Sequence, residues 1–189
     1  MNVLPKVKMN VDQFLAWSAR QPDDRYELVN GQIAAMTCDT VRHNRTKFAA
    51  SRALDDALRA AGLPRIVLID GVGVPINADT LRIPDIIVQC GDEPDPDALA
   101  VDSPVIVVEV VSPSSEKDDT ETELVDYFSV PSIQHYLVIF SDKRIVVHHQ
   151  RKVDGDISTR IASDGDIALN PPGISVPVSA LLSPEKKSE

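Results

Sequence analysis

The sequence predicts an α/β fold with a mixed central sheet flanked by helices. Two segments rich in Val and Ile, Arg82 to Gln89 and Pro104 to Val111, are apolar on both faces, as expected of central strands covered on both sides. The segment from His43 to Ala61 lacks Pro and Gly and is followed by Gly62, a common helix stop. Since helical and strand-like segments alternate, we expect one mixed sheet with helices packed against it.

The N-terminal elements follow from local signals. Apolar residues at helical spacing begin at Val11, and Pro22 ends the pattern, which predicts a short peripheral helix. Asn30 and Gly31 separate two short strand-like runs, and this pair is a strong signal for a tight hairpin turn. A further strand is expected from Arg65 to Ile76.

The second half of the chain predicts one more helix and then strands. Residues from Glu116 to Ser129 have helical composition. From Gln134 to Ile167 short apolar runs alternate with turn residues, at Asp142 and at Asp154-Gly155, which predicts a C-terminal meander of strands. We find no internal repeat and no linker.

Length and composition fit one globular domain. The chain has 189 residues, of which 43% are apolar and 25% are charged. We assign residues 1–10 to an N-terminal arm, residues 11–182 to a single domain and residues 183–189 to a flexible tail. No apolar run approaches the roughly 20 residues of a membrane-spanning helix, and the N-terminus lacks the apolar segment of a signal peptide. We therefore expect a cytoplasmic protein without a membrane partner.

Charge is distributed unevenly along the chain. The formal net charge of −10 argues against a nucleic-acid partner, since proteins that neutralise phosphates usually display a basic surface. The segment from Arg42 to Arg52, however, holds four basic residues and no acid. One basic helix can face a polyanion on an acidic protein, so nucleic acid stays open as a partner.

Two carboxylates interrupt the apolar strands. Asp85 follows Pro84, and Glu109 has only Val and Ile as near neighbours in its strand. An ionised carboxylate there is costly unless it is paired, hydrogen-bonded or bound to a metal. Taken alone, Asp85 is explained equally well as a residue that caps a turn after Pro84. This alternative fits Glu109 less well, because Glu109 lies inside its strand. Because Mg²⁺ and Mn²⁺ prefer carboxylate oxygens, two acids on neighbouring strands indicate a divalent metal site.

Five motifs occur in a characteristic order: YELVNGQI, HN, PDIIV, VVEVVSPSS and YFSVPSIQHYLVI, with Glu109 placed 24 positions after Asp85 (109 − 85). In this order they resemble the PD-(D/E)XK nuclease superfamily and, more specifically, the Uma-two family of putative restriction endonucleases. The resemblance extends from Val11 to Leu182. It implies a restriction-endonuclease-like core, a nuclease-like domain, DNA as substrate and Mg²⁺ or Mn²⁺ as cofactor.

The resemblance also implies roles for individual residues. Asp85 and Glu109 would bind the metal, with the backbone carbonyl of Val110 as a further ligand. Glu27 matches the upstream acid of the family and would complete the metal coordination or orient the attacking water. His43 matches the histidine that opens the following helix and would contact phosphate. As an alternative, His43 is an ordinary polar residue at a helix start.

The lysine of the family is missing from both of its usual positions. Two residues after the strand glutamate the chain has Val111, and the position on the following helix is Glu123. A positioned cation contributes on the order of a few kcal/mol to a charged transition state, so its loss impairs catalysis unless another cation substitutes. Lys47, one helical turn after His43, is the substitute we favour. Lys117 is the other candidate, and for either the alternative is an ordinary surface lysine.

Three functions stay open at this point. The first is a metal-dependent endodeoxyribonuclease. The second is a catalytically impaired nuclease-fold protein that acts as a metal-binding, nucleic-acid-binding or regulatory module, and the third is a structural subunit. Because a restriction enzyme cuts two strands, the resemblance also implies a homodimer.

Two further groups of polar residues argue against other binding sites. His148 and His149 are adjacent in a strand and point to opposite faces, so they cannot chelate one metal, and we expect both to be solvated. Asp119, Glu123 and Asp126 give the second helix an acidic side, which makes DNA binding there unfavourable.

Overall fold

The computed structural model describes residues 7–21, 25–111 and 120–183. The helices are α1 (Val11–Ser18), α2 (Val41–Ala60), α3 (Thr120–Ser129) and α4 (Val178–Leu181). The strands of the first half are β1 (Tyr26–Val29), β2 (Gln32–Ala35), β3 (Arg65–Ile69), β4 (Val74–Asn77), β5 (Thr80–Arg82), β6 (Ile86–Cys90) and β7 (Pro104–Val111). Those of the second half are β8 (His135–Phe140), β9 (Ile145–Arg151), β10 (Ile157–Ala162), β11 (Asp166–Leu169) and β12 (Ile174–Pro177).

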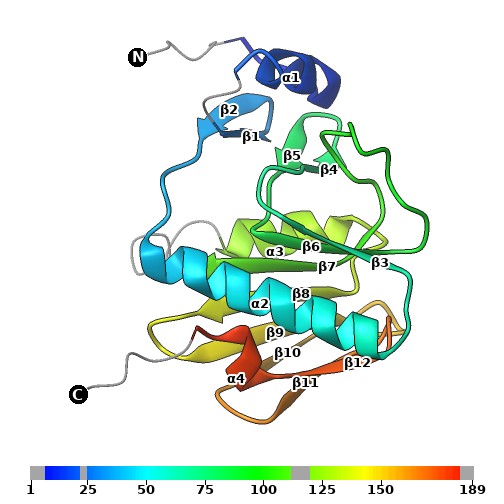
Figure 1. Ribbon diagram of the computed structural model, residues 1–189. Coiled ribbons are helices and arrows are strands. Elements are labelled where there is room, and N and C mark those ends of the chain that lie inside the picture. The colour runs from blue at the N-terminus through cyan, green and yellow to red at the C-terminus, as the bar shows by residue number, and fades with distance from the viewer. Residues whose placement is uncertain (1–6, 22–24, 112–119, 184–189) are drawn as a thin grey trace.

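A six-stranded sheet forms the centre of the fold, in the order β10-β9-β8-β7-β6-β3. Strands β7 and β8 run parallel and the other neighbours run antiparallel, so the sheet is mixed. Helix α2 crosses one face of the sheet, and α3 lies behind it (Figure 1). The predicted mixed central sheet with flanking helices is confirmed.

Residues of β7 alternate between two cores, because successive strand residues point to opposite faces. Ile106, Val108 and Val110 pack in the core beneath α2. Val107 and Val111 pack with Tyr127 of α3 in the core on the other face. This alternation explains why the strand is apolar throughout, and it directs the side chain of Glu109 toward the α3 face.

The predicted single sheet is wrong, because the N-terminal strands form a sheet of their own. This four-stranded sheet has the order β2-β1-β5-β4, and α1 packs on it through Phe14 (Figure 1). The hairpin predicted at Asn30-Gly31 is confirmed, with φ of 51° and 79° at these two residues. Positive φ at both positions is typical of a two-residue hairpin turn.

Two of the predicted strands are each divided in the structure. The segment from Arg65 to Ile76 turns at Asp70 and Gly71, which have φ of 52° and 81° and therefore cannot continue a strand. The segment from Arg82 to Gln89 is interrupted between β5 and β6 at Pro84, which lacks the N–H that a ladder needs. As a result, Asp85 precedes β6 and lies where the chain passes from the small sheet to the large one.

The C-terminal meander is present as β8, β9 and β10, whereas β11 and β12 leave it to pair with each other. This last hairpin and α4 close the core beneath α2 through Ile167, Val176 and Leu181. The predicted start of the second helix, Lys117 and most of the predicted tail lie outside the described residues. None of the helices in the described ranges is long and apolar enough to cross a membrane.

Candidate active site

Asp85 and Glu109 are neighbours at the junction of the two sheets. Ile86 of β6 pairs with Val108 of β7, so Asp85 lies one step beyond this pair. The N–H of Val110 donates to Oδ2 of Asp85 over 2.7 Å, and the backbone N of Asp85 lies 3.4 Å from Oε2 of Glu109. The structure thus brings together the two acids that the sequence analysis singled out.

Helix α2 places two basic side chains beside Asp85. The helix begins after its N-cap Thr40, whose hydroxyl accepts the N–H of His43 over 3.2 Å. From this first turn His43 Nε2 lies 3.1 Å from Oδ2 of Asp85, and one turn later Lys47 Nζ lies 3.4 Å from Oδ1. Burial favours a raised pKa for Asp85, but His43, the Val110 N–H and Lys47 together lower it.

Lys47 is held by three carboxylates. The residue is only 1% exposed, which is rare for a lysine unless it is paired. Nζ donates to both oxygens of Asp70, at 2.8 and 2.9 Å, and to Oδ2 of Asp39, in addition to its contact with Asp85. Burial by itself lowers the pKa of Lys47, but the hydrogen bonds to Asp39 and Asp70 outweigh it and hold the pKa above its ordinary value.

The Nε2 atom of His43 is close to two carboxylates without an aligned hydrogen bond. It lies 3.1 Å from Asp85 and 3.6 Å from Oδ1 of Asp39. The atom is buried, and within the described residues no hydrogen-bond partner satisfies it. A buried polar atom of this kind has the capacity to bind water or a ligand.

Glu109 is engaged from the α3 side of the sheet. The hydroxyl of Tyr127 donates to Oε1 of Glu109 over 2.6 Å. Burial and the nearby charge of Asp85 raise the pKa of Glu109 well above its usual range, and the hydrogen bond from Tyr127 offsets only part of this rise. The same burial and the charge of Glu109 raise the pKa of Tyr127. A cation near Glu109 would relieve this unfavourable environment.

The two usual lysine positions hold no cation here. Val111 is buried in the core on the α3 face. Glu123 accepts the hydroxyl of Tyr136 over 3.1 Å. On the acidic side of α3, Asp126 is paired with Arg82, which donates to its Oδ2 over 2.7 and 2.9 Å. Asp119 lies outside the described residues.

Glu27 braces the segment that carries Asp85. From β1, its Oε1 accepts the N–H of Ile83 over 2.7 Å and its Oε2 lies 3.2 Å from Nη1 of Arg82. Arg82 is 5% exposed and joins Glu27 to Asp126 of α3. The charge of Glu27 also contributes to the raised pKa of Glu109.

The donor set at the sheet junction fits a hard divalent cation. In residues 7–21, 25–111 and 120–183, no three His, Cys, Asp or Glu side chains are grouped as a complete metal site. Mg²⁺, however, is commonly held by one or two carboxylates, with waters and substrate phosphates completing its shell. Asp85 and Glu109 supply two carboxylates, and the carbonyl of Val110 points toward the same strand edge as its N–H.

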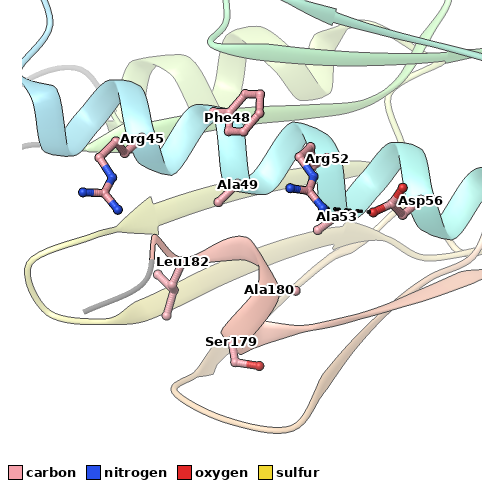
Figure 2. A pocket seen from close by; sticks show the side chains of 9 residues that line it. All are labelled: Arg45, Phe48, Ala49, Arg52, Ala53, Asp56, Ser179, Ala180 and Leu182. Atoms are coloured by element: carbon pink, nitrogen blue, oxygen red, sulfur yellow. Dashed lines mark ion pairs between the residues drawn. The ribbon is translucent and has the colours of Figure 1, made fainter. Parts of the chain in front are cut away.

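Two other features of the structure lie apart from Asp85 and Glu109. The expectation that His148 is solvated is wrong: it is 5% exposed and its Nε2 lies 2.9 Å from Nδ1 of His135, whose Nε2 donates to the carbonyl of Pro171. A pocket of about 500 Å³ lies between α2 and α4 (Figure 2). It is lined by Arg45, Phe48, Ala49, Arg52, Ala53, Asp56, Ser179, Ala180 and Leu182. None of these residues belongs to the group formed by Asp85, Glu109, His43 and Lys47.

Sequence reasoning missed Asp39, Asp70, Tyr127 and Arg82 as members of the site. Asp70 carries a weak signal, since it precedes Gly71 in a turn-like pair, but its pairing with Lys47 depends on how β3 packs beside α2. The other three side chains look like ordinary loop, helix and strand residues in the sequence. Their roles become visible only in three dimensions.

Residues 11–179 match a family model described as Uma2, putative restriction endonuclease. The chain belongs to the Uma2 family. Two relatives come from Synechocystis sp. The uncharacterized protein slr1290 is 28% identical over 80% of this chain and 79% of its own length. The uncharacterized protein sll1609 is 27% identical over 71% of this chain and 76% of its own length. Family membership assigns the chain to the nuclease class, with nucleic acid as the implied substrate.

A solved structure supports the fold. The crystal structure of a putative nuclease of the DUF820 group from Anabaena variabilis superposes with a TM-score of 0.69, over 92% of this chain and 97% of the other, at 14% identity. At this identity the likeness shows the fold alone. The Uma2 chain thus has a nuclease-like fold, as its motifs predicted.

Proposed function

We propose that this Uma2 protein is a metal-dependent endodeoxyribonuclease, with Asp85 and Glu109 as ligands of Mg²⁺ or Mn²⁺ and Val110 as a further backbone ligand. The observation that carries the proposal is the convergence of both acids with His43 and Lys47 at one end of the central sheet. When bound there, a divalent cation stabilises charge on a phosphate oxygen and lowers the pKa of water.

His43 and Lys47 act on the phosphate side of the proposed site. The ammonium of Lys47 lies beside Asp85 and remains protonated, so it offsets negative charge that develops during phosphodiester cleavage. His43 presents a buried Nε2 to the same region and hydrogen-bonds a phosphate oxygen. Lys47 thereby takes the role of the lysine that is absent at Val111 and Glu123.

Glu27 is proposed as a positioning residue for Asp85. Its hydrogen bond to the Ile83 N–H fixes the short connection between β5 and β6, two residues before Asp85. Arg82 ties this connection to α3 through Asp126. A site held by such contacts keeps its carboxylates in place before substrate arrives, which lowers the reorganisation needed for the reaction.

A second candidate function is a nuclease-fold protein with impaired cleavage that binds metal or nucleic acid as a regulatory module. The hydrogen bond from Tyr136 to Glu123 favours it, because a carboxylate occupies the position of a family lysine. This candidate predicts metal binding without efficient cleavage. The first candidate predicts both.

A cleavage assay separates the two candidates. Supercoiled plasmid DNA is incubated with the protein and Mg²⁺ or Mn²⁺, beside Asp85→Asn, Glu109→Gln and the distant control Asp56→Asn. We expect nicking or linearisation by the wild-type protein and by the control, and at least a hundredfold loss in the two site variants. Cleavage that persists in both site variants would exclude the proposed ligands.

We further propose that the protein acts in the cytoplasm as a homodimer, since cutting both strands of a duplex calls for two copies of the site. Size-exclusion chromatography with light scattering measures the mass of the particle directly. A mass of 20.6 kDa, that of one chain, at all concentrations would contradict the homodimer.

A further inference from the structure

One carboxylate bridges the two basic side chains of the site. Oδ2 of Asp39 contacts Nζ of Lys47, and its Oδ1 lies 3.6 Å from Nε2 of His43. Asp39 lies directly before Thr40, the N-cap of α2, so its charge also faces the positive end of the helix dipole. A carboxylate in this position has the same partners that a phosphate group would use.

The three donors of the Lys47 ammonium are all directed at carboxylates in this state. They donate to Oδ2 of Asp39 and to both oxygens of Asp70, and Asp85 adds an ion-pair contact at 3.4 Å. An ammonium has three N–H donors and no acceptor, so a phosphate oxygen gains a hydrogen bond from Lys47 only when one of the three carboxylates leaves. The question is therefore which carboxylate the ligand replaces.

Asp70 and Asp85 are anchored by contacts beyond Lys47. Both carboxylate oxygens of Asp70 accept hydrogen bonds from Lys47, and Oδ1 also lies 3.3 Å from Nη1 of Arg25. The backbone N–H of Asp70 donates to the carbonyl of Asp85 over 3.1 Å. Asp85 accepts the Val110 N–H.

Asp39 is held less firmly than these two acids. Among the described residues, the recorded side-chain contacts of Asp39 are those with Lys47 and His43. It lies in the connection between β2 and α2, and its exposed fraction of 22% is close to the 28% of Asp70, so the distinction rests on its fewer anchoring contacts. Of the three carboxylates, Asp39 is thus the one that can move away at least cost.

We propose that His43 and Lys47 form a binding site for one phosphate group of a nucleic acid, and that Asp39 occupies this site in the free protein until the phosphate displaces it. The inference rests on the proposed function for the identity of the ligand. Asp39 then competes with substrate, and its removal strengthens binding instead of weakening it.

The test measures binding without catalysis. The dissociation constant of a short fluorescein-labelled DNA duplex is determined in EDTA for the wild-type protein, Asp39→Asn and Asp56→Asn. Asp56 is an exposed residue of α2 that pairs with Arg52 at 4.0 Å, and its variant changes the net charge as much as Asp39→Asn does. We expect Asp39→Asn to bind roughly fivefold more tightly or better, and Asp56→Asn to stay within about twofold of wild type.

Inorganic phosphate provides a second probe, followed by the ring-proton chemical shifts of His43. We expect the shifts to saturate at lower phosphate concentration in Asp39→Asn than in the wild-type protein. Both probes work in a protein that does not cleave DNA, so failure of the proposed function and failure of this inference are distinguishable.

Three outcomes would overturn the inference. The first is weaker or unchanged binding of both probes by Asp39→Asn, and the second is an equal gain in affinity in Asp56→Asn. The third is loss of folding in both Asp39→Asn and Asp39→Ser, which would make Asp39 a structural anchor. Thermal unfolding followed by circular dichroism identifies the last case.

Discussion

Nζ of Lys47 lies 3.4 Å from Oδ1 of Asp85, which joins the middle of α2 to the entry of β6. A lysine on a helix and an aspartate before a strand thus form one polar cluster inside an otherwise apolar layer. The cluster supplies a cation next to an acid although the usual lysine positions are occupied by Val111 and Glu123. This relationship leads to the first prediction.

Replacing Lys47 by Met should both destabilise the protein and abolish cleavage. The substitution leaves Asp39, Asp70 and Asp85 close together without their shared cation, and loss of one partner from a buried ion pair costs about 3–5 kcal/mol. Urea unfolding gives the stability change, with Lys152→Met at an exposed position as the matched control. A Lys47→Met protein with unchanged stability would show that the three acids do not depend on this ammonium.

Replacing Tyr127 by Phe should weaken the structural support of Glu109. The variant removes a 2.6 Å hydrogen bond to a buried carboxyl group, for which we expect a loss of about 1–3 kcal/mol in the free energy of unfolding. The same substitution in a Glu109→Gln background should cost at least about 0.5 kcal/mol less, because the partner has changed. Identical losses in both backgrounds would argue against direct coupling of the two residues.

Replacing Glu27 by Gln tests its role as a positioning residue. The charge that faces Arg82 is lost, so we expect a lower free energy of unfolding by about 2–4 kcal/mol and slower cleavage. The Mn²⁺ dissociation constant, in contrast, should stay within about threefold of wild type, since Glu27 acts through Ile83. Loss of Mn²⁺ binding in a folded Glu27→Gln protein would instead make Glu27 a metal ligand.

The two buried histidines should make the protein sensitive to mild acid. Burial, aided by the positive charge that neighbouring His135 acquires when protonated, lowers the pKa of His148 to about 4, and burial also lowers the pKa of His135. A histidine that is neutral in the folded state stabilises the protein above its unfolded-state pKa, and the stabilisation is lost as the pH falls from about 6.5 toward 4. Between pH 7 and 5 this amounts to up to about 2 kcal/mol.

The acid sensitivity should depend on His148 itself. We expect a smaller difference in the free energy of unfolding between pH 7 and pH 5 for His148→Gln than for the wild-type protein. Its half-buried neighbour His149 lies 2.8 Å from the Thr159 hydroxyl and provides the comparison variant, His149→Gln. If the free energy of unfolding depended on pH equally in the wild-type protein and in both variants, the pair of His135 and His148 would be excluded as the cause of the acid sensitivity.

Sequence patterns predicted the elements whose signals are local. The Asn30-Gly31 hairpin, the helix before Gly62 and the doubly apolar strand around Glu109 all follow from short-range rules of turn geometry and periodicity. The break between β5 and β6 was missed even though Pro84 marks it, because the surrounding residues are apolar enough to suggest one strand. The pairing of β1 with β5, which creates a second sheet, is a long-range contact that periodicity does not encode.

The candidate site was predictable only in part, for the same reason. Asp85 and Glu109 stand out because a charge is unexpected in an apolar strand. Asp39 and Asp70 come from connections between elements, where an acid is usually solvated, and their neighbours in the sequence do not indicate a contact with Lys47. The fold alone brings them to Lys47.

Calorimetric titration with Mn²⁺ tests the central claim most directly, namely that Asp85 and Glu109 hold one divalent cation. The account predicts one binding event per chain in the wild-type protein, lost in Asp85→Asn and in Glu109→Gln and retained in the control Asp56→Asn. Absence of Mn²⁺ binding in the wild-type protein, or binding that survives in both site variants, would contradict it.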